Sequence, residues 1–245
     1  MQDARQIAPF SGRVEGYGLD TAYAVAAALR RLRGAKEVGR KIGFTNHTIW
    51  ARYGVDGPMW GDMTETSVTA LDETTVDLSP YLEPRLEPEV ALCLGAAPMP
   101  GMDEAALADC VAWYAPAFEI VQSLFPAWQF TLADCVAAGG LHGRLLLGPP
   151  VDAGPYAAEF ARLRLELKQD DRPVETGSGA NVLGGGPLAA LAHLVKGLAA
   201  RGERGLAAGD IITTGTLTDA QPLKAGTVWS ATYHGTPFGT IKARF

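Results

Sequence analysis

Two glutamates separated by one residue, Glu87 and Glu89, lie in a stretch whose pattern is typical of a β-strand. Val90, Leu92 and Leu94 alternate with the residues between them. Because side chains repeat every second residue along a strand, both carboxylates point to one face, about 6–7 Å apart. Two like charges at that spacing raise each other's pKa unless a cation lies between them. The stretch therefore indicates either a site for a hard divalent cation such as Mg²⁺ or Mn²⁺, or two solvated acids on an edge strand.

A third acid, Glu119, stands inside the apolar stretch 117–121, which has the composition of a buried strand. An unpaired carboxylate is costly to bury, so Glu119 needs a bound cation, a basic partner or a proton. The other acids we considered, Asp62 and Asp134, are interpreted as loop and capping residues rather than ligands.

Composition limits the classes of function. The chain has 245 residues, 47% of them hydrophobic and 20% charged, which is ordinary for a globular protein and excludes global disorder. Its net charge of -6 and its lack of an extended basic cluster predict no nucleic-acid partner.

The cysteines and the termini favour an intracellular protein. Three separated cysteines form no CxxC motif, which argues against a thiolate zinc site or a disulfide framework and fits a reducing compartment. The N-terminus has no apolar core that could act as a secretory signal, and the longest apolar run, 187–200, is too short to span a bilayer. We therefore expect a cytoplasmic protein without a membrane partner.

The elements that must position these acids mix helices with many short strands, so we predict an α+β fold. An N-terminal arm and helix would occupy residues 1–36, and the remaining 37–245 would form the domain that carries the three acids. The expected helices are 20–33, 103–114, 129–138 and 187–202. The expected strands are 37–46, 87–95, 117–121, 145–148, 162–168, 174–176, 210–214, 227–232 and 240–245. Residues 47–63 are expected to form an ordered loop or helical turn over a pocket.

Several short motifs follow one another in an order typical of a known family. They are Val-Gly-Arg-Lys-Ile-Gly at 38–43, Glu-Pro-Glu at 87–89, Phe-Glu-Ile-Val at 118–121, the glycine-rich loop 177–184 and Thr-Thr-Gly at 213–215. Together they resemble the fumarylacetoacetate hydrolase superfamily, above all its branch of 2-keto-4-pentenoate hydratases and 4-oxalocrotonate decarboxylases. The resemblance runs from about Ala4 to Phe245.

This resemblance implies a mixed β-sheet roll with flanking helices, like the C-terminal domain of that family, and a homo-oligomer. It also implies a Mg²⁺ or Mn²⁺ ion held by Glu87, Glu89 and Glu119. Lys41 corresponds to the lysine that transfers protons, and a cation beside it would lower its pKa. The alternative for Lys41 is a lysine that only pairs with a site carboxylate.

Four further residues are candidates for substrate binding. Ser178 and Gly179 could offer a hydroxyl and backbone N–H groups to a substrate carboxylate, and Thr214 could do the same. The alternatives are a plain glycine-rich turn and an ordinary strand end. His142 is a candidate pocket residue.

The resemblance implies a small 2-keto or 2-hydroxydienoic acid as substrate, whose enolate charge the cation would stabilise. Hydration is the function we expect. Alternatives are decarboxylation of the 4-oxalocrotonate type, and C–C hydrolysis or oxaloacetate decarboxylation as found elsewhere in the superfamily. From a different class, the chain could be a weakly catalytic partner subunit of a complex with another pathway enzyme.

The chain departs from the family pattern at three places. The hydratases carry an acid before the aromatic-Gly pair, whereas this chain has Met59 before Trp60-Gly61, and an apolar residue there is typical of the decarboxylases. Ala138-Gly139 replaces an Asp-Asn pair, and Ser123-Leu124 replaces the Ser-Arg pair that usually follows the strand of the third ligand. These changes are expected to alter the substrate pocket and to leave the metal ligands intact.

Overall fold

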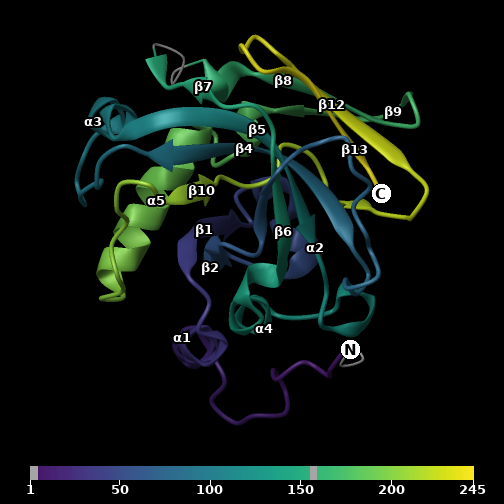
Figure 1. Cartoon of the computed structure of the whole chain (residues 1–245). Coiled ribbons are helices and arrows are strands. Elements are labelled where there is room, and N and C mark those ends of the chain that lie inside the picture. Colours follow the sequence, from purple (N-terminus) through teal and green to yellow (C-terminus); the bar gives the residue numbers. More distant parts are fainter. Residues whose placement is uncertain (1–4, 155–158) are drawn as a thin grey trace.

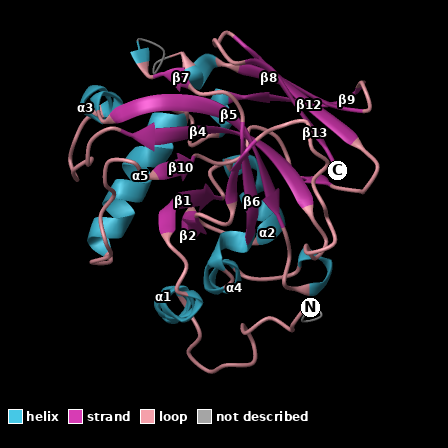
Figure 2. Cartoon of the chain, viewed as in Figure 1, coloured by secondary structure: helices cyan, strands magenta, loops and turns pink. Residues whose placement is uncertain are grey.

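The computed structural model describes residues 5–154 and 159–245, which form two β-sheets with a few helices around them (Figures 1 and 2). The α-helices are α1 (Leu19–Arg33), α2 (Trp50–Tyr53), α3 (Glu104–Asp109), α4 (Leu132–Ala137) and α5 (Pro187–Ala200). The first strands are β1 (Glu37–Gly43), β2 (Met59–Thr64), β3 (Val68–Ala70), β4 (Arg85–Leu94), β5 (Val111–Val121), β6 (His142–Leu147) and β7 (Val151–Asp152). The others are β8 (Arg164–Gln169), β9 (Arg172–Ser178), β10 (Ile211–Thr213), β11 (Gln221–Pro222), β12 (Val228–His234) and β13 (Gly239–Arg244).

The larger sheet is mixed and curled, which confirms the α+β prediction and the β-roll. Its strand order is β2-β1-β10-β4-β5-β6-β3, with β11 beside β4 and β7 beside β5. β1 runs parallel to β10 and β3 parallel to β6, while the other neighbours are antiparallel. The two longest strands, β4 and β5, lie side by side, and Glu87 is paired with Glu119. The sheet therefore brings together acids that lie more than thirty positions apart in the sequence.

The smaller sheet, in the order β13-β12-β8-β9, covers the strands that carry these acids. Leu163, Leu165 and Leu167 are buried while charged residues alternate with them, as the sequence pattern predicted. The Tyr233 hydroxyl on β12 donates to the carbonyl of Glu89 at 2.9 Å, and it lies 3.2 Å from that of Ala117. The smaller sheet thus fixes the backbone of β4 and β5 next to the site.

Helix α5 confirms the predicted helix that begins at Pro187, and it buries one apolar stripe against the larger sheet. Pro at the first helical turn is favoured because its missing N–H would have no partner there. The buried side chains of the stripe are Leu188, Ala190, Leu191, Leu194, Val195 and Leu198.

The predicted helix through Tyr114 is wrong in its second half. α3 ends at Asp109, and Val111–Val121 forms strand β5 instead. Apolar residues at 107, 110, 111 and 114 fit a helical period, but the same residues also fit a buried strand. Backbone pairing of β5 along the whole of β4 decides between the two.

Helix α1 begins at Leu19, one residue before the expected start, and the preceding Gly18 offers no side-chain cap. Its buried face is shallow, because Ala22 is fully buried whereas Leu29 is 37% exposed.

The N-terminal arm is held by Asp134. This residue caps α4 in a capping box with Thr131, which confirms its capping role. The same carboxylate accepts from the backbone N–H groups of Phe10 at 2.7 Å and Ser11 at 3.0 Å. Asp62, in contrast, lies on β2 rather than in a loop, and it pairs with Arg30 and Arg40. No helix within the described residues is long and apolar enough to cross a membrane.

Candidate metal centre and substrate cleft

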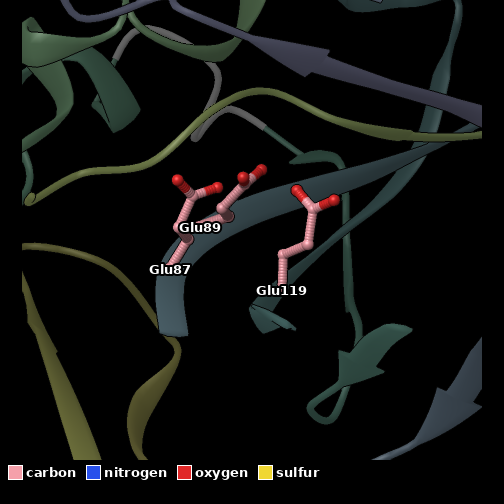
Figure 3. A group of neighbouring side chains, drawn as sticks. All are labelled: Glu87, Glu89 and Glu119. Atoms are coloured by element: carbon pink, nitrogen blue, oxygen red, sulfur yellow. The ribbon is translucent and has the colours of Figure 1, made fainter. Parts of the chain in front are cut away.

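Three carboxylates converge on one side of the β4–β5 ladder. Glu87 and Glu89 lie on one face of β4, and Glu119 lies on β5 opposite Glu87. Each of the three offers a carboxylate oxygen that lies within 4.8 Å of those of the other two. Figure 3 shows the side chains extending in the same direction from the two strands. The structure thus brings together all three predicted ligands.

Two of these carboxylates each leave one buried oxygen without a hydrogen bond. Glu89 and Glu119 are 0% exposed. The Glu89 Oε2 atom accepts from the Gly215 N–H at 2.9 Å, whereas its Oε1 atom has no hydrogen-bond partner. The Glu119 Oε1 atom lies 2.8 Å from His142 Nδ1, whereas its Oε2 atom has no hydrogen-bond partner. Glu119 Oε2 has an ion pair with Lys41 at 3.3 Å, whereas Glu89 Oε1 has no hydrogen bond to compensate its burial. Hard oxygen donors of this kind fit a divalent cation such as Mg²⁺ or Mn²⁺.

Position 215 requires glycine for two reasons, its backbone conformation and the lack of room for a Cβ atom. Its φ of +99° is a region that other L-residues rarely adopt, and a Cβ atom there would lie 1.9 Å from Thr45 Oγ1. The chain can therefore approach Glu89 closely and donate its N–H to the carboxylate.

Burial and the neighbouring ionisable groups shift the pKa values of all three carboxylates. Burial and the neighbouring carboxylates of Glu119 and Glu87 raise the pKa of Glu89 well above its usual range. Burial also raises the pKa of Glu87 to about 7, although Lys41 counteracts it. For Glu119, burial is outweighed by Lys41 and by the hydrogen bond to His142, so its pKa is lowered. Glu119 is therefore held as the anion, while the other two resist ionisation unless a cation is present.

Lys41, the predicted proton-transfer residue, lies at this centre. It is on β1, 2% exposed, and its Nζ is 3.3 Å from Glu119 Oε2 and 3.1 Å from the carbonyl of Gly140. Burial alone would lower the pKa of Lys41, but the carboxylates of Glu119, Glu87 and Glu89 raise it above its ordinary value. Among the protein's own groups, three carboxylates thus outweigh the loss of solvent, and the lowering expected from a bound cation stays a prediction. The ion pair with a site carboxylate, the alternative named above, is present.

A cleft opens beside Lys41 and Glu87. Among its described lining residues, Lys41 is the only cation. The other polar side chains of the lining are Thr45, Asn46, Glu87, Cys135, Thr216 and Asp219. The apolar and aromatic ones are Phe44, Ile49, Met59, Val121, Trp128, Phe130, Leu141 and Ala220. A polar end with the acid cluster therefore continues into an apolar wall.

Met59 lies close to Lys41 in this cleft. A Cβ built on Gly140 would lie 2.8 Å from Lys41 Cδ and 3.1 Å from Met59 Cε, so both side chains reach the same small space. Met59 is 2% exposed and brings no charge to the lysine.

The four predicted substrate-binding residues lie outside the set that lines the cleft. The Thr214 hydroxyl donates to the carbonyl of Val90 at 2.8 Å. Ser178 accepts from the Ala180 N–H at 3.2 Å, and the Gly179 N–H donates to the carbonyl of Leu163 at 3.1 Å. His142 contacts Glu119. These residues support neighbouring groups in the structure, and substrate contact by any of them stays a prediction.

Polar residues that line the cleft also lie in the loops after the site strands, and the sequence pattern did not predict them. Thr45 and Asn46 come directly after β1, and Thr216 and Asp219 come after β10. Such loop residues follow no hydrophobic period. The sequence marks these loops in one way: each of them follows a strand that carries one of the family motifs.

Comparisons with known proteins agree with this arrangement. The sequence model of the family described as "Fumarylacetoacetate (FAA) hydrolase C-terminal" matches residues 58–245. A 2-keto-4-pentenoate hydratase of Paraburkholderia xenovorans is 30% identical, over 100% of this chain and 90% of that protein. A 4-oxalocrotonate decarboxylase of a Pseudomonas species is 32% identical, over 82% of this chain and 79% of that protein.

A solved structure shares the whole architecture. It is a 4-oxalocrotonate decarboxylase from Pseudomonas putida G7, complexed with magnesium and adipate. It aligns with a TM-score of 0.89 and 28% identity, and the match covers 98% of this chain and 91% of that one.

Proposed function

Because the chain belongs to the fumarylacetoacetate hydrolase family, we propose that it is a divalent-metal-dependent hydro-lyase, which hydrates a small 2-hydroxydienoate or 2-keto-enoate. One observation carries the proposal. Glu89 and Glu119 each present a buried oxygen that lacks a hydrogen bond, and they cluster with Glu87. Glu87 and Lys41 in turn line the cleft, where Lys41 lies 3.3 Å from Glu119. Hydratases of 2-keto-4-pentenoate are among the relatives that match nearly the whole chain.

Glu87, Glu89 and Glu119 would hold the ion, for which Mg²⁺ or Mn²⁺ is proposed. When bound, a divalent ion would supply Lewis-acid stabilisation of negative charge on the 2-oxygen of the substrate. The relatives of known structure include one complexed with magnesium and one complexed with calcium.

Lys41 would move the proton. Its Nζ lies 3.3 Å from Glu119 Oε2 and the residue lines the cleft, so the ammonium form can donate a proton to a substrate bound there. Protonation of the terminal carbon of the dienol, with loss of the enol proton, gives a conjugated 2-keto-enoate. Water then adds its hydroxyl to carbon 4 and its proton to carbon 3, which yields a 4-hydroxy-2-oxo acid.

The cleft favours a monocarboxylate over a dicarboxylate. A 4-oxalocrotonate-type substrate carries a second carboxylate, which needs a cation or several donors at the far end of the site. Lys41 is the one cationic side chain among the described lining residues, and it already pairs with Glu119. The aromatic wall fits the hydrocarbon end of a dienoate instead.

Decarboxylation is the second candidate, and two observations favour it. Met59 places no acid beside Lys41. The guanidinium of Arg85 lies 4.2 Å from the centroid of the Trp128 ring, so a cation stands next to the aromatic wall.

Product analysis by proton NMR separates the two reactions. The protein is incubated with Mg²⁺ and, in separate tubes, with 2-hydroxypenta-2,4-dienoate and 2-oxohex-3-enedioate. A 4-hydroxy-2-oxo acid from the dienoate supports the hydratase. Release of CO₂ from the dioate, without hydration of the dienoate, would replace it by the decarboxylase. In that case Arg85→Met should weaken turnover of the dioate but not the binding of Mn²⁺.

We also infer a homo-oligomer that works in the cytoplasm and forms complexes with a pathway enzyme. Apolar side chains of the N-terminal arm and α1 support self-association, since Val14 is 50% and Leu32 is 82% exposed. Light scattering coupled to size-exclusion chromatography measures the mass of the particle in solution and so tests the homo-oligomer. A monomeric mass at micromolar concentration would contradict the homo-oligomer.

A further inference from the structure

The two buried glutamates of the metal centre share a pattern: a protein donor or ring nitrogen contacts one oxygen, and the other oxygen has no hydrogen bond. For Glu89 the contact is the Gly215 N–H, which reaches Oε2. For Glu119 the contact is the His142 ring, which lies 2.8 Å from Oε1. A carboxylate can turn about its last bond, so a contact of this kind determines where the remaining oxygen points.

The second nitrogen of the His142 ring also has a hydrogen-bond partner. Its Nε2 atom lies 2.9 Å from Ser67 Oγ. Ser67 Oγ in turn accepts from the Thr64 N–H at 3.0 Å, in the turn between β2 and β3. The chain of contacts therefore runs from a backbone turn through Ser67 and His142 to Glu119.

The hydrogen on the ring can be assigned from its partner. Nδ1 lies 2.8 Å from Glu119 Oε1, and a carboxylate that holds a metal ion must be ionised. An ionised carboxylate only accepts hydrogen bonds, so Nδ1 of His142 must carry the hydrogen that lies between them.

His142 does not line the substrate cleft. Its side chain is 6% exposed and borders a second cavity, which it shares with Ser67 and Gln122. We therefore propose that His142 is a positioning residue: its Nδ1–H fixes the Glu119 carboxylate so that Oε2 faces the metal, and Ser67 braces the ring. This assignment rests on the proposed metal-dependent function and replaces the expectation of substrate contact.

Two nearly isosteric substitutions test the proposal. The amide nitrogen of Asn can take the place of Nδ1, whereas that of Gln reaches the place of Nε2. His142→Asn should therefore keep the bond to Glu119, and His142→Gln should lose it while still reaching Ser67. The readout is the Kd for Mn²⁺, measured without substrate from the EPR signal of free Mn²⁺. We expect His142→Gln to weaken binding about 10–100-fold, as for other residues that orient metal ligands, and His142→Asn to weaken it by less than about threefold.

Circular dichroism and thermal melting of the metal-free proteins serve as the folding control. If His142→Gln does not fold, Ser67→Ala provides the second test, with an expected intermediate loss of Mn²⁺ affinity. A merely structural role would lower both melting temperatures and leave the Kd values of the folded proteins alike. Equal Kd values for wild type, His142→Gln and Ser67→Ala would overturn the proposal. A wild-type protein that binds no Mn²⁺ would instead overturn the proposed function.

Discussion

Glu87 and Glu119 lie directly opposite each other on the neighbouring antiparallel strands β4 and β5. Like charges in a cross-strand pair destabilise a sheet, and here Glu89 adds a third carboxylate to the same cluster. Lys41 supplies one positive charge against three. When all three carboxylates are ionised, the cluster carries an excess of negative charge that a divalent cation would balance.

Lys41→Met should abolish turnover without loss of the metal. Methionine keeps most of the side-chain volume but cannot carry a proton, so we expect turnover to fall about 10²–10⁴-fold. Mn²⁺ affinity should stay equal or increase, because a positive charge has left the cluster. Steady-state hydration kinetics and Mn²⁺ titration measure the two effects. Lys168→Met, on the exposed part of β8, is the matched control, and it should behave as wild type.

Full activity of Lys41→Met would contradict a role of Lys41 in proton transfer. The lysine would then only pair with Glu119, and proton transfer would have to be assigned elsewhere. If both the variant and the wild type were inactive, while flux through a reconstituted pathway still depended on the chain, the role of a partner subunit would be favoured.

The affinity for metal should depend on pH around neutrality. Burial, helped by Glu119 and opposed by Lys41, raises the pKa of Glu87 to about 7, so the ligand binds a proton below that pH. Mn²⁺ competes with this proton, and affinity should fall by up to about tenfold per unit as the pH drops from 7 to 5. Isothermal titration calorimetry in buffers of different ionisation enthalpy should detect proton release at pH 6. Affinity that is constant from pH 5 to 8 would contradict the raised pKa.

The metal-free protein should show the opposite trend in stability. The folded state keeps a proton on Glu87 that the unfolded state loses near pH 4.5, so stability should decrease as the pH rises from about 4.5 to 7. Thermal melts at several pH values, with and without Mn²⁺, measure this contribution. Mn²⁺ should raise the melting temperature more at pH 7.5 than at pH 5.5.

Gly215→Ala should damage the metal site more than a comparable glycine change elsewhere. The new Cβ would collide with Thr45, and the backbone shift would break the hydrogen bond to Glu89. Gly209→Ala is the control, because its φ is similar at +88° but nothing lies within 4 Å of the new Cβ. Both variants should lose roughly 1–2 kcal/mol of stability from the unfavourable φ. A marked loss of Mn²⁺ affinity should appear in Gly215→Ala alone, and an equal loss in both would argue against the Gly215–Glu89 contact.

Asp134→Ala should release the N-terminal arm while leaving the metal centre intact. The carboxylate accepts from the N–H groups of Phe10 and Ser11 as well as from Thr131, and all of these contacts would be lost. We expect destabilisation of about 1–3 kcal/mol and faster proteolysis within residues 5–18. Because these hydrogen bonds lower the pKa of Asp134, its contribution is present above the unfolded-state pKa near 4 and disappears as the pH falls below it. Unchanged proteolysis of the arm would contradict this role.

The clustering of the three carboxylates with Lys41 could be predicted from two sources. The spacing of Glu87 and Glu89 on a strand indicated a shared face, and the family resemblance implied Glu119 and Lys41 as their neighbours. The role of His142 could not be predicted, because its contact with Glu119 depends on the pairing of β5 with β6. Residues 111–114 form a strand rather than a helix because they pair with β4, and the spacing of apolar residues along the sequence cannot reveal such pairing. Loop residues such as Thr216 carry no periodic signal at all.

The central claim is that Glu119 belongs to a metal site on which hydration depends, and the comparison of Glu119→Gln with wild type tests it most directly. Glutamine keeps the shape and an acceptor for His142 but removes the charge, so the variant should fold, with a lower melting temperature because the buried Lys41 loses its ion pair. Glu166→Gln, whose side chain is 49% exposed in the wild type, is the control. The account predicts that wild type and Glu166→Gln lose hydration of 2-hydroxypenta-2,4-dienoate in EDTA and regain it with Mg²⁺. Glu119→Gln should stay at least about a hundredfold slower in both conditions. Wild-type turnover by folded Glu119→Gln, or hydration by wild type that EDTA does not affect, would contradict the account.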